Sequence, residues 1–388
     1  MVPNGWKKTH LKCVISGAIK NGYSPLPAST TTGYWVLSLG ALTDHGINPL
    51  EIKPVVVDEK VKQALLSDGD FLISRSNTPD KVGRSIRFKN EVQNCSYPDL
   101  MMRFCVDTKK ADPNFIEIKL KSTEVRQYYK SCAAGSSSSM VKINKAVVEN
   151  TPLLLPSFPE QKKIAQVLST WDRAISTTEQ LLANSQQQKK ALMQQLLTGK
   201  KRLLDNNGVR FSGEWSFITF DDMFKVNNKK SAQVKSSDYL EAGAVPVVDQ
   251  GKQLIVGYCN NKEIYTDIPV IVFGDHTRCL KWVDFEFCPG ADGTQVLDTK
   301  AGIDKKFGYY SLCFTDIPNL GYSRHMRELK EKDFKVPLDA KEQQKIAAVL
   351  STADQEITTL QQKLDALKQE KKALMQQLLT GKRRVLVS

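Results

Sequence analysis

Several features that define common classes of protein are missing from this 388-residue sequence. No stretch approaches the ~18 consecutive apolar residues of a membrane-spanning helix. The start, MVPNGWKKTH, has no apolar run after its positive charges, as a secretory signal would have. The eight cysteines include no CxxC pair, which favours buried thiols in a reducing compartment over disulfides or zinc ligands. We therefore expect a cytoplasmic protein.

Motifs for catalysis are also missing. Gly199-Lys200 and Gly381-Lys382 lack the upstream glycine and the following Ser or Thr of a phosphate-binding loop. We find no glycine-rich cofactor loop, and no Asn or Asp followed by Pro-Pro and an aromatic residue, as an adenine methyltransferase would carry. The four isolated histidines have no metal-ligand spacing. We expect no catalytic residue, metal or cofactor in this chain.

One loose pattern supports an alternative. Pro98-Asp99 followed by Glu117-Ile118-Lys119 has the layout of a PD…ExK nuclease, in which two carboxylates hold Mg²⁺ and the lysine supports the attacking water. Such patterns are common by chance, and the run YPDLMMRF around Asp99 also fits the edge of a core strand. A DNA nuclease with its own coiled-coil spacer therefore stays the alternative hypothesis.

Basic residues are in excess, with 55 Lys and Arg against 42 Asp and Glu, which gives a net charge of +13. An excess of this size indicates a polyanionic partner, and nucleic acid is the commonest. A basic surface that only aids solubility would give the same charge.

A segment that occurs twice organises the chain. Residues 160–202 align with 342–384 without a gap, 28 of the 43 pairs are identical, and KKALMQQLLTGK recurs unchanged at 189–200 and 371–382. The blocks that precede the two copies hardly resemble each other. The predicted order is a variable block at 1–156, a helical spacer at 157–202, a variable block at 203–338 and a helical spacer at 339–388.

Each copy carries signals for the start and the end of a helix. Ser157 with Glu160, and Asp339 with Glu342, match a capping box, in which the Glu reaches back to a free backbone N–H. Gly199 and Gly381 precede Lys and Arg and suit a left-handed helix end.

Between these signals runs a seven-residue apolar repeat. In the second copy it consists of two series, Ile346, Ala353, Leu360, Leu367 and Leu374, and Leu350, Ile357, Leu364, Lys371 and Leu378, and all of these residues except Lys371 are apolar. In the first copy Thr178, Ser185 and Lys189 interrupt it. A heptad repeat of this length predicts a coiled coil. The first copy, with several polar seam positions, should pair better with the more apolar second copy than with another first copy. We expect the two helices to pack antiparallel within one chain.

The identity of the two copies extends beyond the seam. Lys190, Gln194 and Gln195 recur as Lys372, Gln376 and Gln377, where packing between the helices demands nothing in particular. We interpret these six residues as two identical docking sites for two equivalent partners. A pure spacer is the alternative.

The variable blocks read as mixed α and β, with strand-like runs such as 70–73 and 269–273. Weak correspondences link them: Tyr128-Tyr129 with Tyr309-Tyr310, and GSSSSM at 135–140 with GYSRHM at 321–326. The blocks therefore look like two divergent copies of one fold.

Several phrases resemble one known family. LPSFPEQKKIAQVLSTWD (155–172), VPLDAKEQQKIAAVLSTAD (336–354), the ends LLTGKKR and LLTGKRR, DGDFLISR (68–75) and VFGDHTR (272–278) resemble the DNA-specificity subunit of type I restriction-modification systems. The likeness covers essentially the whole chain. It implies an α+β protein in which two α/β target-recognition domains are separated by two long antiparallel coiled-coil helices with pseudo-two-fold symmetry.

The resemblance also implies a function without catalysis. Each variable block would read one half of a split asymmetric target in double-stranded DNA, and the helices would set the spacing and dock two adenine methyltransferase subunits. Restriction and translocase subunits would complete the complex. S-adenosylmethionine, ATP and Mg²⁺ would be used by these partners.

Base reading needs short-range donors and acceptors, with Arg on guanine and Asn or Gln on adenine as the strongest pairings. The residues that we select on this ground stand beside glycines or in turns, where solvated polar side chains are also common. They are Arg75, Ser76, Asn77, Arg84, Arg87 and Ser136, Ser137, Ser138 in the serine run of the first block, and His276, Thr277, Arg278, Lys281, Tyr322, Arg324 and His325 in the second.

Overall fold

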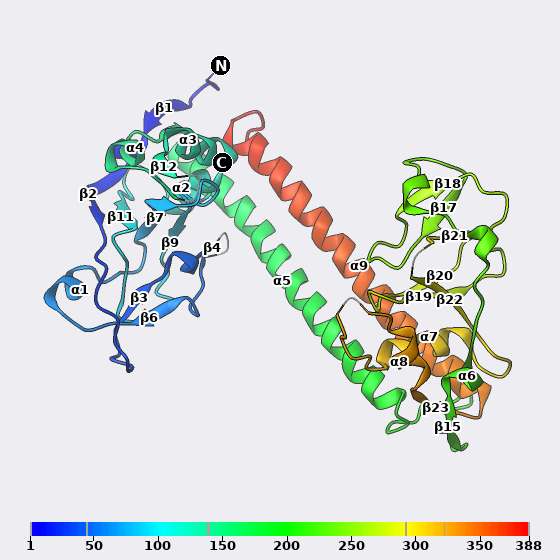
Figure 1. Cartoon of the computed structure of the whole chain (residues 1–388). Helices are drawn as coiled ribbons and strands as arrows, with labels where there is room; N and C mark the ends of the chain where they lie inside the picture. The colour runs from blue at the N-terminus through cyan, green and yellow to red at the C-terminus, as the bar shows by residue number, and fades with distance from the viewer. Residues whose placement is uncertain (1, 44–45, 138–139, 292, 322, 387–388) are drawn as a thin grey trace. The chain divides into compact units, whose positions relative to one another are not determined.

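The structure is a computed structural model that describes residues 2–43, 46–137, 140–291, 293–321 and 323–386. It forms two compact units (Figure 1): unit 1 is Met1–Thr177 with Leu364–Ser388, and unit 2 is Thr178–Lys363. Each unit combines one variable block, called here the N-terminal head (residues 2–156) or the C-terminal head (203–338), with parts of both long helices.

A four-stranded antiparallel sheet forms the centre of the N-terminal head. In spatial order its strands are β2 (Ile15–Asn21), β11 (Met101–Val106), β7 (Phe71–Ser74) and β9 (Ser85–Arg87). In a second sheet, β3 pairs in parallel with β10 and antiparallel with β6; these strands are β10 (Cys95–Ser96), β3 (Trp35–Leu37) and β6 (Ile52–Pro54). The strand pair that leads to the first long helix is β1 (Lys7–His10) with β14 (Pro152–Leu155).

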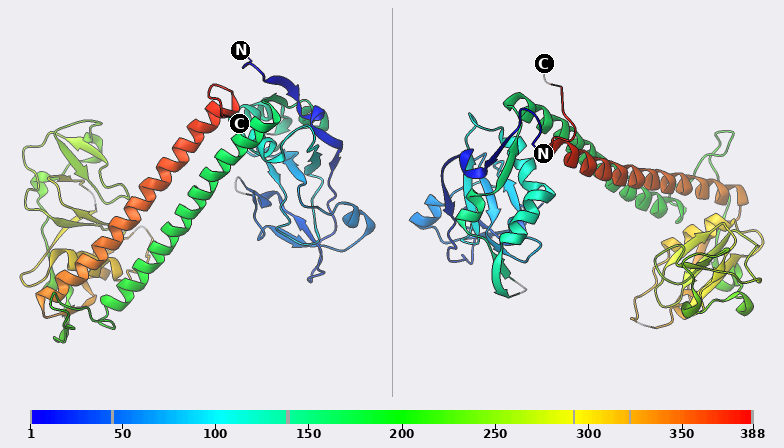
Figure 2. Two further views of the ribbon diagram at one scale, coloured as in Figure 1. Left: turned by 180° about the vertical axis from the view of Figure 1, so that it is seen from behind. Right: turned by 90° about the horizontal axis from the view of Figure 1, so that it is seen from above.

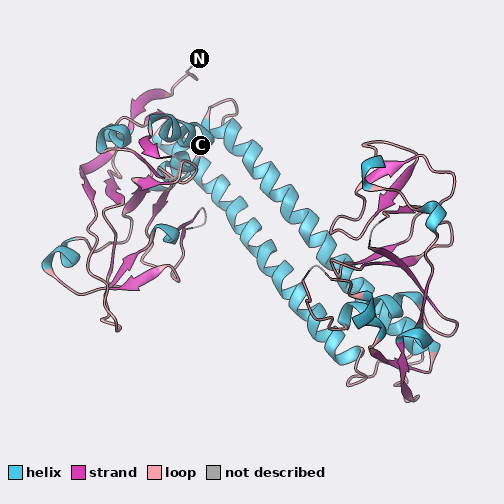
Figure 3. Cartoon of the chain, viewed as in Figure 1, coloured by secondary structure: helices cyan, strands magenta, loops and turns pink. Residues whose placement is uncertain are grey.

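The remaining elements of the N-terminal head connect or cover these sheets (Figure 3). The strands are β4 (Leu42–Thr43) with β5 (Gly46–Ile47), and β8 (Ser76–Asn77) with β13 (Met140–Lys142) and β12 (Ala134–Ser137). The helices are η1 (Leu11–Cys13), η2 (Leu39–Ala41), α1 (Glu59–Gln63), α2 (Pro113–Lys121), α3 (Thr123–Cys132) and α4 (Lys145–Glu149).

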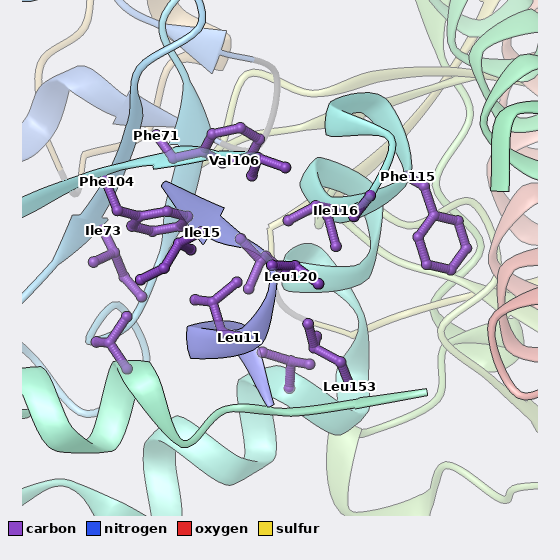
Figure 4. Packing of buried hydrophobic residues seen from close by; sticks show 14 of the residues in the cluster. Leu11, Ile15, Phe71, Ile73, Phe104, Val106, Phe115, Ile116, Leu120 and Leu153 are labelled. Carbon is purple, nitrogen blue, oxygen red and sulfur yellow. The ribbon is translucent and has the colours of Figure 1, made fainter. Parts of the chain in front are cut away.

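The core of this head lies between the main sheet and α2. Asp112 starts α2 by accepting a hydrogen bond from the Phe115 N–H, and Pro113 follows it in the first turn. The helix then turns Ile116 and Leu120 toward Ile15, Phe71, Ile73 and Phe104 of the sheet (Figure 4). Burial of these side chains, at about 1.5–3 kcal/mol each, holds the sheet in place under the loops described below.

The C-terminal head repeats this topology. Its main sheet has the order β16 (Phe224–Val226), β22 (Thr294–Thr299), β19 (Val270–Gly274) and β20 (Leu280–Val283). In its second sheet β17 (Val245–Val248) lies between β18 (Gly257–Cys259), antiparallel, and β21 (Cys288–Pro289), parallel. The other elements are β15 (Trp215–Thr219) paired with β23 (Asp333–Pro337), α6 (Phe220–Met223), η3 (Lys230–Ala232), η4 (Ser236–Asp238), α7 (Lys305–Phe314) and α8 (Met326–Lys330). The matching strand orders agree with the prediction of two divergent copies of one fold.

The repeated segments form the long helices α5 (Phe158–Leu196) and α9 (Ala340–Leu379), which lie side by side and antiparallel within each unit (Figure 2). In unit 1, Lys371 Nζ lies 2.5 Å from the Asp172 carboxylate; in unit 2, Lys189 Nζ lies 2.5 Å from that of Asp354. Two of the polar residues on the predicted seam, Lys189 and Lys371, thus form contacts between the helices. Ser185, also on the seam, is buried and donates a hydrogen bond to Glu356 at 3.0 Å. No helix of the described residues has the length and apolar content of a membrane span.

The predicted helix ends are confirmed, but the predicted role of one residue type is wrong. Gly199 and Gly381 both have φ +70°, the left-handed conformation that favours glycine. Glu160 and Glu342 do not complete capping boxes. Each is buried and bound instead by an arginine near the end of the other copy, Arg384 and Arg202 respectively.

Candidate functional site

Each head joins two loops at one end of its main sheet. In the C-terminal head, residues 275–279, between β19 and β20, meet the described part of 320–325, which precedes α8; we call them the second loop pair. In the N-terminal head, residues 75–84, between β7 and β9, meet the described part of 134–142; we call them the first loop pair. The two pairs occupy equivalent places in the shared topology.

Buried hydrogen bonds hold the second loop pair together. The Asp275 carbonyl accepts from both the backbone N–H and Nδ1 of His325, each at 2.8 Å. Asp275 Oδ1 accepts from the Met326 N–H at 2.7 Å, and His276 Nδ1 donates to the Ser323 carbonyl at 3.2 Å. Two clusters that lie about fifty residues apart in the sequence therefore form one site.

Two arginines stand at the surface of the second loop pair. Arg324 is exposed. Arg278 is partly exposed and donates from Nη1 to the Ile317 carbonyl at 2.8 Å. Its φ of +60° is unusual for a residue other than glycine and costs on the order of 1 kcal/mol or more. Strain of this kind clusters at functional sites. The exposed Thr277 lies between this residue and His276.

Backbone pairing, by contrast, holds the first loop pair together. β8 pairs with β13, with Asn77 opposite Val141 and Ser76 opposite Lys142. Helix α3 braces the turn within 75–84, since Arg126 donates to the Val82 and Asp80 carbonyls, both at 2.7 Å. Of the predicted arginines, Arg75 is partly exposed. Arg84 donates to the Leu42 carbonyl at 3.1 Å.

Unpaired buried polar atoms mark the same end of both sheets. Among the described residues, five buried side-chain polar atoms have no hydrogen-bond partner, and four of them lie in or beside the loop pairs. They are the hydroxyls of Ser76, Ser85, Thr294 and Ser323. An unsatisfied buried hydroxyl costs roughly 1–3 kcal/mol, so the presence of such hydroxyls at the same end of both main sheets indicates a binding surface.

The structure corrects the expected exposure of several predicted DNA contacts. Ser76 and Asn77 are buried in β8, and Lys281 and His325 are also buried. Lys281 donates to the Asp249 carbonyl at 2.7 Å, and burial lowers its pKa while Asp249 opposes this. The sequence does not distinguish a polar residue that faces water from one that faces the interior, so the burial of these residues could not be predicted from it.

Other predicted contacts lie elsewhere in the head or outside the described residues. Arg87 lies at the far end of β9 from the loop, with Nε 3.7 Å from the Glu117 carboxylate. Ser136 and Ser137 belong to β12. Ser138 and Tyr322 lie outside the described residues.

Sequence reasoning missed Gln250 and Asp275. Gln250 follows β17; its Oε1 accepts from the His276 N–H at 3.1 Å, and its carbonyl accepts from the Thr277 hydroxyl. The turn sequence DQGK directly after a strand was the available signal.

The nuclease pattern does not form a metal site. Asp99 accepts from the Ser24 hydroxyl, and Lys119 is fully buried and donates to Glu124 and to the Leu379 carbonyl. Glu117 pairs with Lys121 at 3.0 Å and with Lys89 at 3.4 Å. Burial raises its pKa, but these cations and Arg87 outweigh it, and the net pKa is lowered. Among the described residues no three acidic, His or Cys side chains gather as metal ligands do.

The identical stretch of the repeat has a buried face and an exposed face in both units. Its apolar residues pack on the heads: Leu192, Met193, Leu196 and Leu197 on the C-terminal head, and Leu374, Met375, Leu378 and Leu379 on the N-terminal head. Its polar residues Lys190, Gln194, Gln195, Lys372, Gln376 and Gln377 are exposed. Packing therefore explains why the apolar residues are identical in the two copies. It does not explain why the exposed polar residues are also identical.

The two heads share one topology, carry different side chains on equivalent loop pairs and are joined by two antiparallel helices. This arrangement defines a two-headed recognition protein. The chain belongs to the family of type I restriction modification DNA specificity domains, whose model matches residues 55–184 and 212–369. It is a non-catalytic specificity subunit of a type I restriction-modification system, with DNA and the other subunits of such a complex as partners.

Individual relatives agree with this assignment. The chain is 24% identical to the protein assigned as the specificity subunit of the type I restriction enzyme MjaX in Methanocaldococcus jannaschii, over 99% of this chain and 95% of the other. Over 22% of its length it is 37% identical to the EcoR124I/EcoR124II specificity subunit of Escherichia coli, of which this covers 21%. The fold resembles the solved S subunit from M. genitalium, with a TM-score of 0.64, 15% identity and 96% of each chain covered.

Proposed function

We propose that each head reads one half of a split DNA target and that the two exposed copies of the repeat each dock one adenine methyltransferase subunit. The shared topology of the heads carries the first part, because equivalent loop pairs bear different side chains. The second loop pair offers His276, Thr277 and Arg278 with Arg324, whereas the first offers Arg75 and Arg84. Unlike loops on a like frame suit unlike half-sites.

The chemistry of the second loop pair suits base edges better than phosphates alone. An arginine fork pairs with both acceptors of a guanine, and a threonine hydroxyl donates or accepts at short range. The net charge of +13 supplies the sequence-independent attraction to DNA that base reading requires.

The repeated polar face carries the second part of the proposal. Two copies of one exposed face suit two copies of one partner. A solved structure with the same fold, at a TM-score of 0.57 and 14% identity, is described as the basis of complex assembly in a type I system. In our proposal the methyltransferase and the restriction and translocase subunits use S-adenosylmethionine, ATP and Mg²⁺, and this chain supplies only recognition and spacing.

A survey of methylated adenine tests the proposal. In cells that express this chain with its methyltransferase partner, we expect one split motif with two unlike halves. Arg324→Gln should change one half only, and an exposed arginine outside the loop pairs, Arg327→Gln on α8, should change neither. A single continuous motif, or a change in both halves with Arg324→Gln, would contradict independent reading.

A further inference from the structure

In the second loop pair, one backbone hydrogen bond from His325 to Asp275 is reinforced by side-chain hydrogen bonds, whereas a strand ladder joins the first loop pair. The ring of His325 is central to the side-chain part. We propose that His325 is a positioning residue that sets the base preference of the C-terminal head by holding Arg324 in place relative to Thr277 and Arg278. This inference rests on the proposed function, because it assumes that the second loop pair reads DNA.

The position of His325 shows what it connects. It directly follows the exposed Arg324, and its partner Asp275 directly precedes residues 276–278. His325 is 1% exposed and Asp275 2% exposed, so water does not compete for their bonds. A movement of either residue would shift both groups of candidate base-reading side chains.

The hydrogen bonds of the ring define its form. A carbonyl can only accept, so Nδ1 carries the proton and donates to the Asp275 carbonyl at 2.8 Å. Nε2 is then the acceptor of the Leu320 N–H at 3.3 Å. One ring therefore joins the start of the 320–325 loop to the start of the 275–279 loop.

Asp275 is itself fixed from a third side. Its backbone N–H donates to the Gly293 carbonyl at 2.7 Å, just before β22, and its carboxylate accepts from Met326 at the start of α8. The loop pair is thus anchored to the main sheet through Asp275, and His325 extends this anchor to the described residues of the segment before α8.

The N-terminal head solves the same problem differently. There, β8 and β13 join the two loops through backbone hydrogen bonds, which do not depend on any one side chain. A side-chain tie is sensitive to single substitutions, and a backbone ladder is not. Loss of the tie should therefore affect the half-site of the C-terminal head alone.

Three substitutions of His325 test the two hydrogen bonds of its ring one at a time. His325→Asn keeps a donor near the position of Nδ1, His325→Gln keeps an acceptor near that of Nε2, and His325→Leu keeps neither. Val336→Ala is the control for stability, because Val336 is buried in β23 and belongs to neither loop pair. Each variant is assembled with the methyltransferase subunits, its melting temperature is measured, and its methylated-adenine motif is determined beside wild type and Arg324→Gln.

We expect His325→Leu to reduce base discrimination in one half of the motif by roughly tenfold, as for the loss of one well-placed base contact, while the other half is unchanged. His325→Asn should retain most of the discrimination and His325→Gln should lose it, because the bond to Asp275 joins the two loops directly. Val336→Ala should lower the melting temperature without relaxing either half.

Each other result has a definite meaning. If Arg324→Gln leaves both halves unchanged, the proposed function of the second loop pair fails. If Arg324→Gln relaxes one half but a folded His325→Leu keeps the wild-type motif, the positioning role alone fails. If His325→Leu does not assemble, identical motifs for the Asn and Gln variants would overturn it, and so would equal relaxation in Val336→Ala at the same melting temperature.

Discussion

Arg384 lies 224 residues after Glu160, and its guanidinium donates two hydrogen bonds to the Glu160 carboxylate, from Nε at 2.6 Å and from Nη2 at 2.9 Å. Arg202 holds Glu342 in the same way, at 2.6 Å and 2.7 Å. Each pair joins the start of one repeat copy to the end of the other. Trp6 Nε1 also donates to Glu160, at 3.2 Å. In each unit, therefore, an ion pair links the start of one long helix to the segment that follows the end of the other.

Removing either arginine should destabilise the unit that contains it. Arg384→Met leaves Glu160, which is 2% exposed, without its ion-pair partner, and Arg202→Met does the same to Glu342 at 1%. Because Arg384 is 46% exposed and Arg202 22%, we expect Arg202→Met to cost more, near the lower end of the roughly 3–5 kcal/mol for a broken buried pair. Hydrogen exchange measured by segment should show faster exchange in the affected unit only. Arg383→Met, at an exposed neighbour, is the control; equal effects of all three would contradict the role of the ion pairs.

Glu117→Gln should lower stability at neutral pH without affecting any activity. The pKa of Glu117 is lowered in the folded protein, so its ionised form stabilises the fold above the unfolded pKa of about 4.3, and this contribution is lost as the pH falls through the folded pKa. The difference in unfolding free energy between wild type and variant should therefore shrink as the solution is acidified below about pH 4. A difference independent of pH would contradict the ion-pair role. DNA cleavage by wild type with Mg²⁺ that Glu117→Gln abolishes would revive the nuclease hypothesis.

The substitution Arg278→Gly should test the role of the arginine side chain without changing the backbone conformation at this position. Glycine accepts the φ of +60°, so the loop conformation is kept and the backbone strain is relieved. This gain is offset by the loss of the hydrogen bond to the Ile317 carbonyl and by the greater freedom of glycine in the unfolded chain, so the fold should be about as stable as wild type or slightly less stable. Binding to the cognate site should weaken by roughly 1–3 kcal/mol if the guanidinium contacts a base, with little loss on random DNA. If binding to cognate and to random DNA weakened equally, and the slope of log binding constant against log salt concentration became smaller by about 0.9, Arg278 would be a phosphate contact.

Charge reversal on the repeated face should remove one partner at a time. Lys190→Glu with Gln194→Glu in the first copy should lower the number of bound methyltransferase subunits from two to one, and the matched pair Lys372→Glu with Gln376→Glu should do the same. All four changes together should abolish docking. Lys363→Glu, on an exposed position outside the identical stretch, is the control. Native mass measurements that still find two subunits in either double variant would favour the spacer-only account.

Lengthening both helices should widen the gap between half-sites. One heptad inserted after Asn184 and one after Ala366 preserve the apolar seam and add about 10 Å of rise at ~1.5 Å per residue. This corresponds to up to roughly 3 base pairs at ~3.4 Å each, and less if DNA twist or bending absorbs it. The half-site sequences should stay the same because neither head is changed. A methylation survey that finds an active enzyme with the original gap would refute the helices as a ruler.

Local patterns in the sequence were sufficient to predict the two long helices and the repeated order of head and helix. The seven-residue spacing from Ile346 to Leu378 predicts a seam by itself, because helix periodicity alone decides which residues share a face. The left-handed ends at Gly199 and Gly381 are equally local. Identity between the copies, together with weak echoes such as Tyr129 and Tyr310, was enough to predict two heads of one fold.

Contacts between distant residues were decided only by the tertiary structure. Glu160 sits where a capping box expects it, yet its partner is Arg384, which no local pattern could reveal. His325 and Lys281 read as surface residues because the sequence does not record whether a polar side chain faces the core. Asp275 was not selected at all, since its importance comes from a bond to a residue fifty positions away. A helix seam repeats along one chain segment and can be counted, whereas burial and long-range pairing depend on how separate segments pack, and the sequence encodes these only through the folded whole.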